Sequence, residues 1–128
     1  MTIRNSSQAR RAKAVGRDAE NKVVEWLKEV LGFANVERRR LSGVEDCGDI
    51  AGCPGLVVEV KGGRQMTWPK FIAELEAEIE NANKRFPGDP HNGFVVKKKM
   101  GTTDVDDWYI TMTGKQFREF LLRWYNQK

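Results

Sequence analysis

The chain has few of the residues on which disulfide-bonded, zinc-binding or membrane-spanning proteins depend. It contains two cysteines, Cys47 and Cys53, and one histidine among 128 residues, which is too few for a disulfide framework or for a zinc site. No apolar run approaches the roughly 20 residues that cross a bilayer, and the N-terminal segment lacks the apolar core of a signal peptide. We therefore expect a soluble, cytoplasmic protein without a membrane partner, in which both thiols are reduced and any metal ion is held by oxygen.

The length and the hydrophobic spacing indicate a single α/β domain over residues 1–128, with residues 1–10 as a flexible basic arm. We expect helices over 7–31, 67–86 and from 113 onward, and strands over 35–41, 49–51, 56–61, 94–98 and 108–112. Residues 52–55 are predicted to join two of these strands in a hairpin. The last helix is predicted to bury an apolar stripe formed by Phe117, Phe120, Leu121 and Trp124. This order favours a central mixed sheet of about five strands flanked by helices.

Positive charge is concentrated in clusters and not spread evenly along the chain. The net charge is +4. The basic positions are Arg10, Arg11, Lys13 and Arg17, then Arg38, Arg39 and Arg40, then Arg64, and finally Lys97, Lys98 and Lys99. Such clusters exceed what solubility requires, so they favour a surface that binds nucleic-acid phosphates. The alternative is a set of solvated faces that only keep the protein in solution.

Glu59 and Lys61 interrupt the most hydrophobic predicted strand. Side chains alternate along a strand, so these two residues share one face. Asp49 lies on the preceding predicted strand, where the hairpin would bring it beside Glu59. Two carboxylates held together repel unless a cation lies between them, and a divalent ion would explain the arrangement. If the face were exposed, the alternative would be an ordinary surface pair of Glu59 and Lys61.

Glu20 is a further acid in an apolar setting, because helical periodicity places it between Val24 and Leu27 on the buried side of the first helix. It would fit as another ligand of the same ion or of a second one. Several acids and one lysine around a hard cation suit the hydrolysis of a phosphodiester, in which the ion polarises a phosphoryl oxygen and lowers the pKa of a bound water. Lys61 suits contact with that water or with a phosphate oxygen.

An aspartate, a short turn and Glu-x-Lys, preceded by a helix that carries an acid, form a pattern that resembles the PD-(D/E)XK nuclease superfamily. Within it, the chain resembles the archaeal and phage-type Holliday junction resolvases over about residues 10 to 125. The segments that carry this likeness are 40–43, 48–50, 58–61, 93–97 and 108–110. The resemblance implies a restriction-endonuclease-like core and a homodimer that nicks opposed strands of a four-way DNA junction in recombination and repair. It also implies Mg²⁺ or Mn²⁺, no small-molecule cofactor and, if phage-encoded, action in the host cytoplasm.

The same resemblance assigns roles to particular residues. It implies a metal site formed by Glu20, Asp49, Glu59 and Val60, with Lys61 as the catalytic lysine and Ser42 beside the scissile phosphate. It also implies that the DNA backbone is held by basic residues, namely Arg10, Arg11, Lys13, Arg17, Arg38, Arg39, Arg40, Arg64 and Lys97.

Some interpretations remain open from the sequence. Glu76 and Glu80 either extend the metal site or belong to a solvated helix face, and Trp68 is a candidate substrate contact. Two alternative functions stand beside the junction-resolving nuclease. One is another PD-(D/E)XK nuclease that acts on duplex DNA or DNA ends in repair or restriction, and the other is an inactive DNA-binding module. The residues by themselves indicate a nuclease, while the resemblance supplies the junction.

Overall fold

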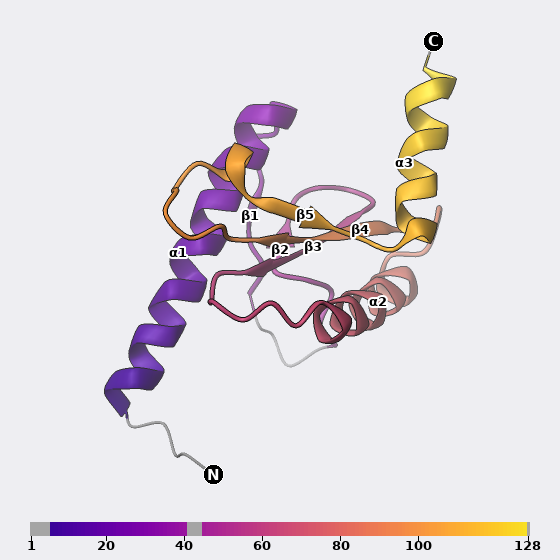
Figure 1. Ribbon diagram of the computed structural model, residues 1–128. Coiled ribbons are helices and arrows are strands. Elements are labelled where there is room, and N and C mark those ends of the chain that lie inside the picture. The colour runs from indigo at the N-terminus through magenta and orange to yellow at the C-terminus, as the bar shows by residue number, and fades with distance from the viewer. Residues whose placement is uncertain (1–5, 41–44, 128) are drawn as a thin grey trace.

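The structure is a computed structural model that describes residues 6–40 and 45–127 and has an α/β architecture (Figure 1). In chain order its elements are α1 (Ser6–Leu31), β1 (Glu37–Arg38), β2 (Ile50–Ala51), β3 (Leu56–Lys61), α2 (Trp68–Arg85), β4 (Asn92–Lys97), the 3-10 helix η1 (Val105–Asp107), β5 (Tyr109–Thr111) and α3 (Gly114–Asn126). The predicted order of helices and strands is confirmed, and η1 is added to it. None of the helices in these described ranges is long and apolar enough to span a membrane.

The strands form two small sheets where the sequence predicts one sheet of about five strands. In the larger sheet β3 and β4 are parallel and β4 and β5 are antiparallel, while β1 and β2 form an antiparallel pair. The predicted hairpin is therefore wrong, because β2 pairs with β1. The positive φ of Gly52 (92°) turns the chain after only two residues of β2. The two sheets meet where the backbone N–H of Asp49 donates to the carbonyl of Val58 at 2.9 Å.

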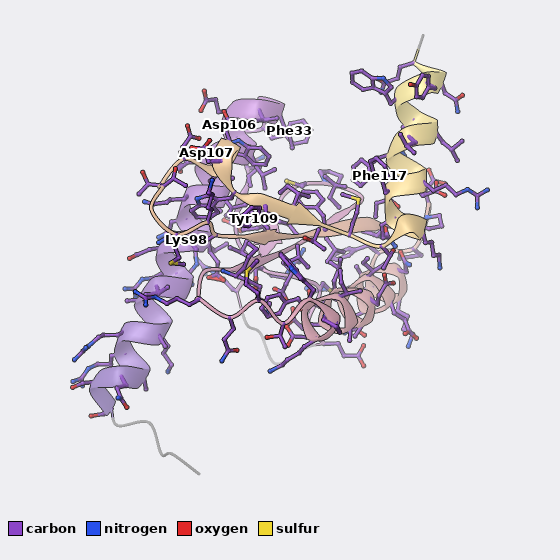
Figure 2. All side chains as sticks on the ribbon, in the orientation of Figure 1. Phe33, Lys98, Asp106, Asp107, Tyr109 and Phe117 are labelled. Atoms are coloured by element: carbon purple, nitrogen blue, oxygen red, sulfur yellow. The ribbon has the colours of Figure 1, made fainter. Side chains whose placement is uncertain are left out.

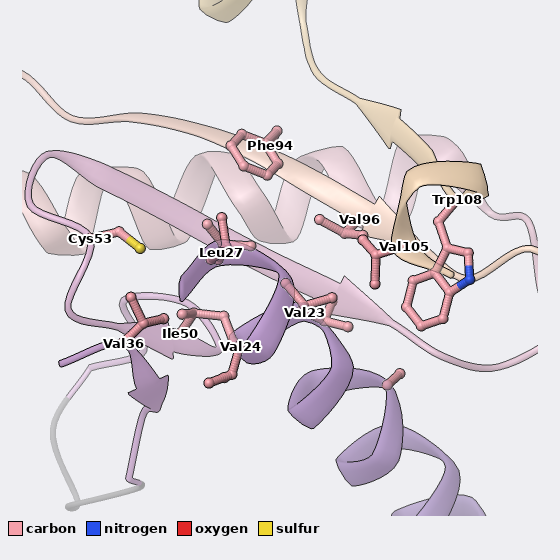
Figure 3. Packing of buried hydrophobic residues seen from close by; sticks show 13 residues of the cluster. Val23, Val24, Leu27, Val36, Ile50, Cys53, Phe94, Val96, Val105 and Trp108 are labelled. Carbon is pink, nitrogen blue, oxygen red and sulfur yellow. The ribbon is translucent and has the colours of Figure 1, made fainter. Parts of the chain in front are cut away.

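Strand β3 is buried on both faces because a helix covers each of them. Val58 and Val60 belong to the larger hydrophobic cluster. Helix α1 contributes Val23 and Leu27 to the same cluster (Figure 3). Val57 packs against α2 in the second cluster. Since side chains alternate along a strand, Glu59 and Lys61 share the α2 face with Val57. Buried parallel strands are usually almost entirely apolar, so this position of two charged residues calls for a functional explanation.

Helix α1 is longer than the core that it covers. Its buried residues, Ala19, Val23, Val24 and Leu27, all belong to its second half. The first turns extend away from the sheets (Figure 1). The segment predicted as a flexible arm is helical from Ser6 onward, which corrects that prediction for residues 6–10, and residues 1–5 lie outside the described part of the chain.

The apolar stripe of α3 is largely exposed, which corrects the prediction that it is buried. Phe117 (Figure 2), Leu121 and Trp124 are exposed, and Phe120 is partly buried against the core. The helix is attached through its first turn, where Thr113 caps it and the buried Gln116 side chain accepts a hydrogen bond from the N–H of Gly93. Beyond that turn α3 extends away from the sheet (Figure 1). The helical spacing therefore identifies an apolar face that residues 6–40 and 45–127 leave largely exposed.

Gly93→Ala is expected to lower the free energy of unfolding by about 1–3 kcal/mol, because overpacking a tight site forces its neighbours to move. A methyl group at this position of β4 would lie 2.7 Å from the carbonyl oxygen of Val57 and 3.0 Å from the side chains of Leu75 and Ile79. Urea titration followed by circular dichroism measures the change.

Gly114→Ala is the control for this prediction. A methyl group at Gly114 meets nothing within 4 Å, and alanine favours the helix, so this variant should be as stable as the native protein or slightly more so. If Gly93→Ala matched the native stability, the close packing of α2 on β4 would be contradicted.

Candidate active site

Asp49 and Glu59 meet where the two sheets join. Asp49 directly precedes β2, and Glu59 lies in the middle of β3, where it is 4% exposed. Oδ2 of Asp49 accepts a hydrogen bond from the backbone N–H of Val60 at 2.7 Å, and the carboxyl groups of Asp49 and Glu59 are hydrogen-bonded to each other. The structure thus brings together the two acids that the sequence predicts to meet, although no hairpin connects them.

Glu78 of α2 joins this contact, and sequence reasoning missed it. Its carboxyl group is hydrogen-bonded to that of Glu59, it is 5% exposed, and its Oε2 is buried without a partner among the described residues. Position 78 lies three residues after Leu75 and four before Ala82, both of which are buried. This helical spacing was the available signal, because it places a glutamate on the face of α2 that covers the sheet. We call Asp49, Glu59 and Glu78 the acid cluster.

Burial and mutual contact make the acid cluster hold protons near neutral pH. Burial raises the pKa of Asp49 to about 9, and the contact with Glu59 adds to that shift. Burial also raises the pKa of Glu59 to about 8 and that of Glu78 to about 7. Carboxylates held this close repel, so either protons or a cation must lie among them.

Lys61 lies beside the acid cluster, one alternation beyond Glu59 on β3. Its ammonium group is 2.5 Å from Oε2 of Glu74 on α2 and 3.9 Å from Oε2 of Glu59, and it lies 5.1 Å from the ring centroid of Phe71. Burial lowers the pKa of Lys61, but the Glu74 hydrogen bond and the nearby carboxylates outweigh this effect, so that the pKa is raised overall. The lysine is therefore a cation at neutral pH, and Glu74 positions it.

Glu20 reaches the same region from α1. Its Oε1 accepts a hydrogen bond from Nε of Arg38 at 3.1 Å. Burial raises the pKa of Glu20, the negative charge of Asp49 raises it further, and Arg38 opposes both effects. Glu20 therefore lies close enough to Asp49 to interact with it, as predicted. Arg38 partly neutralises the negative charge of Glu20.

The donor atoms around the acid cluster suit a hard divalent cation. The amide and carbonyl of one strand residue face the same neighbouring segment, so the carbonyl of Val60 faces the edge at which its N–H bonds Asp49. Oxygen donors from carboxylates and a backbone carbonyl are those that Mg²⁺ and Mn²⁺ prefer, and the unpartnered Oε2 of Glu78 adds one more. Within residues 6–40 and 45–127, no three acidic, histidine or cysteine side chains are already arranged around a common point as metal ligands. The donor set fits such an ion in its chemistry.

Most of the predicted DNA-binding residues are exposed. Six of them are exposed and form no ion pair with Glu20 or the acid cluster, namely Arg10, Arg11, Lys13, Arg17, Arg40 and Arg64. Arg38 is exposed and pairs with Glu20, while Arg39 is half-buried. Ser42, predicted beside the scissile phosphate, lies outside the described residues.

The prediction that Lys97 contacts DNA is wrong, because its side chain is buried. It is 1% exposed, and its ammonium group donates to the carbonyl oxygens of Gly63 and Lys98. Lys97 pairs with Lys61 in the parallel register of β4 and β3. Its observed role is therefore to hold the loop that follows Lys61.

The remaining candidates lie away from the acid cluster contacts. Glu80 is exposed and pairs with Lys84 at 3.4 Å, as expected for a solvated helix face. Glu76 is half-buried and lines a groove between α2 and α3. Trp68 is half-buried and packs edge-on against Phe71 at 5.9 Å between ring centroids.

We compared the chain with models of protein families, with curated proteins and with solved structures, and none of them matches. The geometry of the acid cluster and Lys61 is therefore the structural evidence that bears on function.

In the absence of divalent ions, the free energy of unfolding is expected to fall as the pH rises from about 5 to about 9. Carboxyl groups of an unfolded chain titrate near pH 4, to within about half a unit, whereas the pKa values of the folded acid cluster lie at about 7, 8 and 9. Between these ranges the folded chain holds more protons than the unfolded chain, so raising the pH favours unfolding. Urea titrations across this pH range in EDTA measure the decline.

Glu59→Gln should flatten the decline, because it removes one of the titrating groups and its repulsion of the other two. Glu80→Gln is the matched control on α2, since Glu80 is exposed and paired with Lys84, and it should leave the decline unchanged. Stability that rises with pH in the native protein, or the same slope in Glu59→Gln, would contradict the contact of these acids.

Proposed function

We propose that the protein is a metal-dependent DNA endonuclease with a restriction-endonuclease-like core, which resolves four-way junctions by paired phosphodiester hydrolysis. The observation that carries this proposal is the contact of Asp49 with Glu59 on the buried strand β3, beside Lys61. Burying carboxylates against each other destabilises a fold, and groups with strongly shifted pKa values are typical of functional sites. The choice of a four-way junction over other DNA comes from the resemblance of the motif segments.

Asp49, Glu59 and the carbonyl of Val60 would hold a Mg²⁺ or Mn²⁺ ion, with Glu20 and Glu78 as the nearby acids that could complete its ligands. When bound, such an ion polarises a phosphoryl oxygen and lowers the pKa of an attacking water. Its ligands must lose their protons, so metal binding and deprotonation of the acid cluster are coupled.

Lys61 would stabilise the negative charge that grows on the phosphate oxygens during hydrolysis. Its ammonium group lies between Glu59 and Glu74, which fix its position, and its raised pKa keeps it charged at neutral pH. A positioned cation in a partly buried site is worth more than the same charge in water, because it needs no reorganisation as the reaction proceeds. Glu74 is a positioning residue in this scheme.

The exposed basic residues support a DNA-binding surface that is continuous with the site. Gly62, directly after Lys61, packs closely on α1, since a methyl group there would lie 2.8 Å from Cβ of Ala19. Helix α1 therefore touches the loop that follows Lys61 near Ala19, and its basic first turns lie beyond this contact. Arg64 is exposed in the same loop. Phosphate contacts by such residues supply affinity for DNA without reading its sequence.

We propose further that two chains act together, because paired nicks on opposed strands require two active sites. A homodimer contact is supported by exposed apolar residues of α3 and β5, namely Phe117, Leu121, Trp124, Tyr109 and Ile110. The free and buried thiols of Cys47 and Cys53 support a cytoplasmic location.

Asp49→Asn and Glu59→Gln are expected to lower the rate of junction cleavage by at least about 1,000-fold, because each removes a charged metal ligand. Binding of the junction should equal that of the native protein at neutral pH, where the acid cluster holds protons, and should be tighter at about pH 9, where the native protein carries an additional negative charge near the phosphates. Single-turnover cleavage of a synthetic four-way junction with Mg²⁺, and binding by fluorescence anisotropy in EDTA, measure the two effects.

Glu80→Gln is the control and should cut at the native rate. Symmetric nicks across the branch support the proposed substrate, while cleavage of plain duplex or of ends assigns the same chemistry to another DNA. Tight binding by the native protein without any cleavage, or cleavage by Glu59→Gln at the native rate, would contradict the proposed active site.

A further inference from the structure

A cavity of about 560 Å³ adjoins the acid cluster at the other end of the α2 face of β3. The residues that line it and carry the argument are Arg39, Cys47, Cys53, Val57, Phe86 and His91. Val57 precedes Glu59 by two residues on the same face of β3, a separation of about 7 Å along a strand. The backbone N–H of Arg39 also donates to the carbonyl of Asp49 at 2.8 Å. The cavity and the acids therefore share one backbone framework.

The lining is mostly apolar, but it also carries two aromatic rings and two charged groups, those of Phe86, His91, Arg39 and Asp89. The two rings lie 6.2 Å apart between centroids. Phe86, at the end of α2, is 43% exposed. The guanidinium carbon of Arg39 lies 6.0 Å from the centroid of this ring, and that of Arg85 lies 5.2 Å from it. Arg39 donates from one terminal nitrogen to the carbonyl of Ile50 at 3.3 Å, but its Nε is buried with no partner among the described residues.

An occupant of this cavity must satisfy several requirements at once. It must offer a hydrogen-bond acceptor to the guanidinium group of Arg39, which lines the cavity, because a donor that an occupant encloses without a partner is costly. It must also offer an apolar face to Phe86 and to the two thiols. A bare phosphate meets the first requirement but would be desolvated against apolar walls, and an aliphatic side chain would leave the guanidinium group without an acceptor. A planar heteroaromatic ring with carbonyl or ring-nitrogen acceptors meets both.

We propose that this cavity takes an unpaired nucleobase, which stacks on Phe86 and accepts a hydrogen bond from Arg39, next to the phosphate held at the acid cluster. The proposal rests on the nuclease function for its substrate, since the base belongs to a nucleotide beside the scissile bond. Stacking on an aromatic ring tolerates any of the four bases, so the cavity selects DNA whose bases are unpaired near the cut and does not read its sequence.

The experiment removes the base and the ring separately and then together. Four-way junctions carry one abasic nucleotide at each position flanking the cut, and the native protein is compared with Phe86→Leu. One abasic position should slow native cleavage and weaken native binding by about 10-fold, and Phe86→Leu should do the same on the intact junction. On the junction with that abasic position, Phe86→Leu should cause no further loss.

Phe33→Leu is the matched control, because Phe33 is also 43% exposed and is not among the residues that line the cavity. The fold-change in cleavage rate that Phe33→Leu causes should be the same on the intact junction and on the junction with the abasic position. Arg39→Gln serves if Phe86→Leu fails to fold, and it should show the same coupling to the abasic position.

Binding in EDTA separates this proposal from the nuclease proposal. Coupling between Phe86→Leu and an abasic position in binding, without cleavage by the native protein, would support the cavity and contradict the activity. Cleavage with purely multiplicative effects at every position would contradict a base drawn from the DNA. Equilibrium dialysis with dAMP and dCMP tests the other source. Binding that Phe86→Leu abolishes would assign the cavity to a free nucleotide, and no binding in either assay would overturn the nucleobase proposal.

Discussion

The contact between two buried carboxyl groups, those of Asp49 and Glu59, is the constraint on which the rest of the structure depends. Burial raises the pKa of both groups, so at neutral pH the fold must either hold protons between them or hold a cation. Apolar packing on both faces of β3 offsets the free energy that this contact costs. Helix α1 packs on one face and α2 on the other. The hydrophobic clusters keep the acids together against their repulsion, and the site therefore lies on a strand that is buried on both faces.

Helix α2 supplies the groups that complete the site. Glu78 adds a third carboxyl group to the contact, and Glu74 fixes the ammonium group of Lys61 at 2.5 Å. Close packing of α2 on the sheet at Gly93 sets the depth at which both glutamates meet β3. The C-terminal end of the same helix carries Phe86 to the neighbouring cavity. The same helix therefore contributes residues to the proposed metal site and to the proposed base-binding cavity.

Much of this arrangement could be predicted from the sequence, where local patterns determine it. Helical and alternating spacing identified the order of elements and strand β3 at its observed bounds. Asp49 and Glu59 do meet, but they were predicted to do so through a hairpin that the structure does not contain. The pairing of β2 with β1 could not be predicted, because it depends on the turn at Gly52 and on contacts between distant segments. The burial of Lys97 and the exposure of α3 were also missed, since spacing shows which face is apolar but not whether anything covers it. Glu78 was missed although its spacing marks it, because a glutamate on a charged helix reads first as a solvated residue.

The most direct test of the central claim is calorimetric titration of the protein with Mn²⁺ at neutral pH in two buffers that differ in ionisation enthalpy. We expect saturable binding that releases protons, because the ion displaces those held by the acid cluster. Glu59→Gln should lose most of both the binding and the proton release. Binding with no proton release, or equal binding by the native protein and Glu59→Gln, would show that the buried carboxyl groups do not form a metal site.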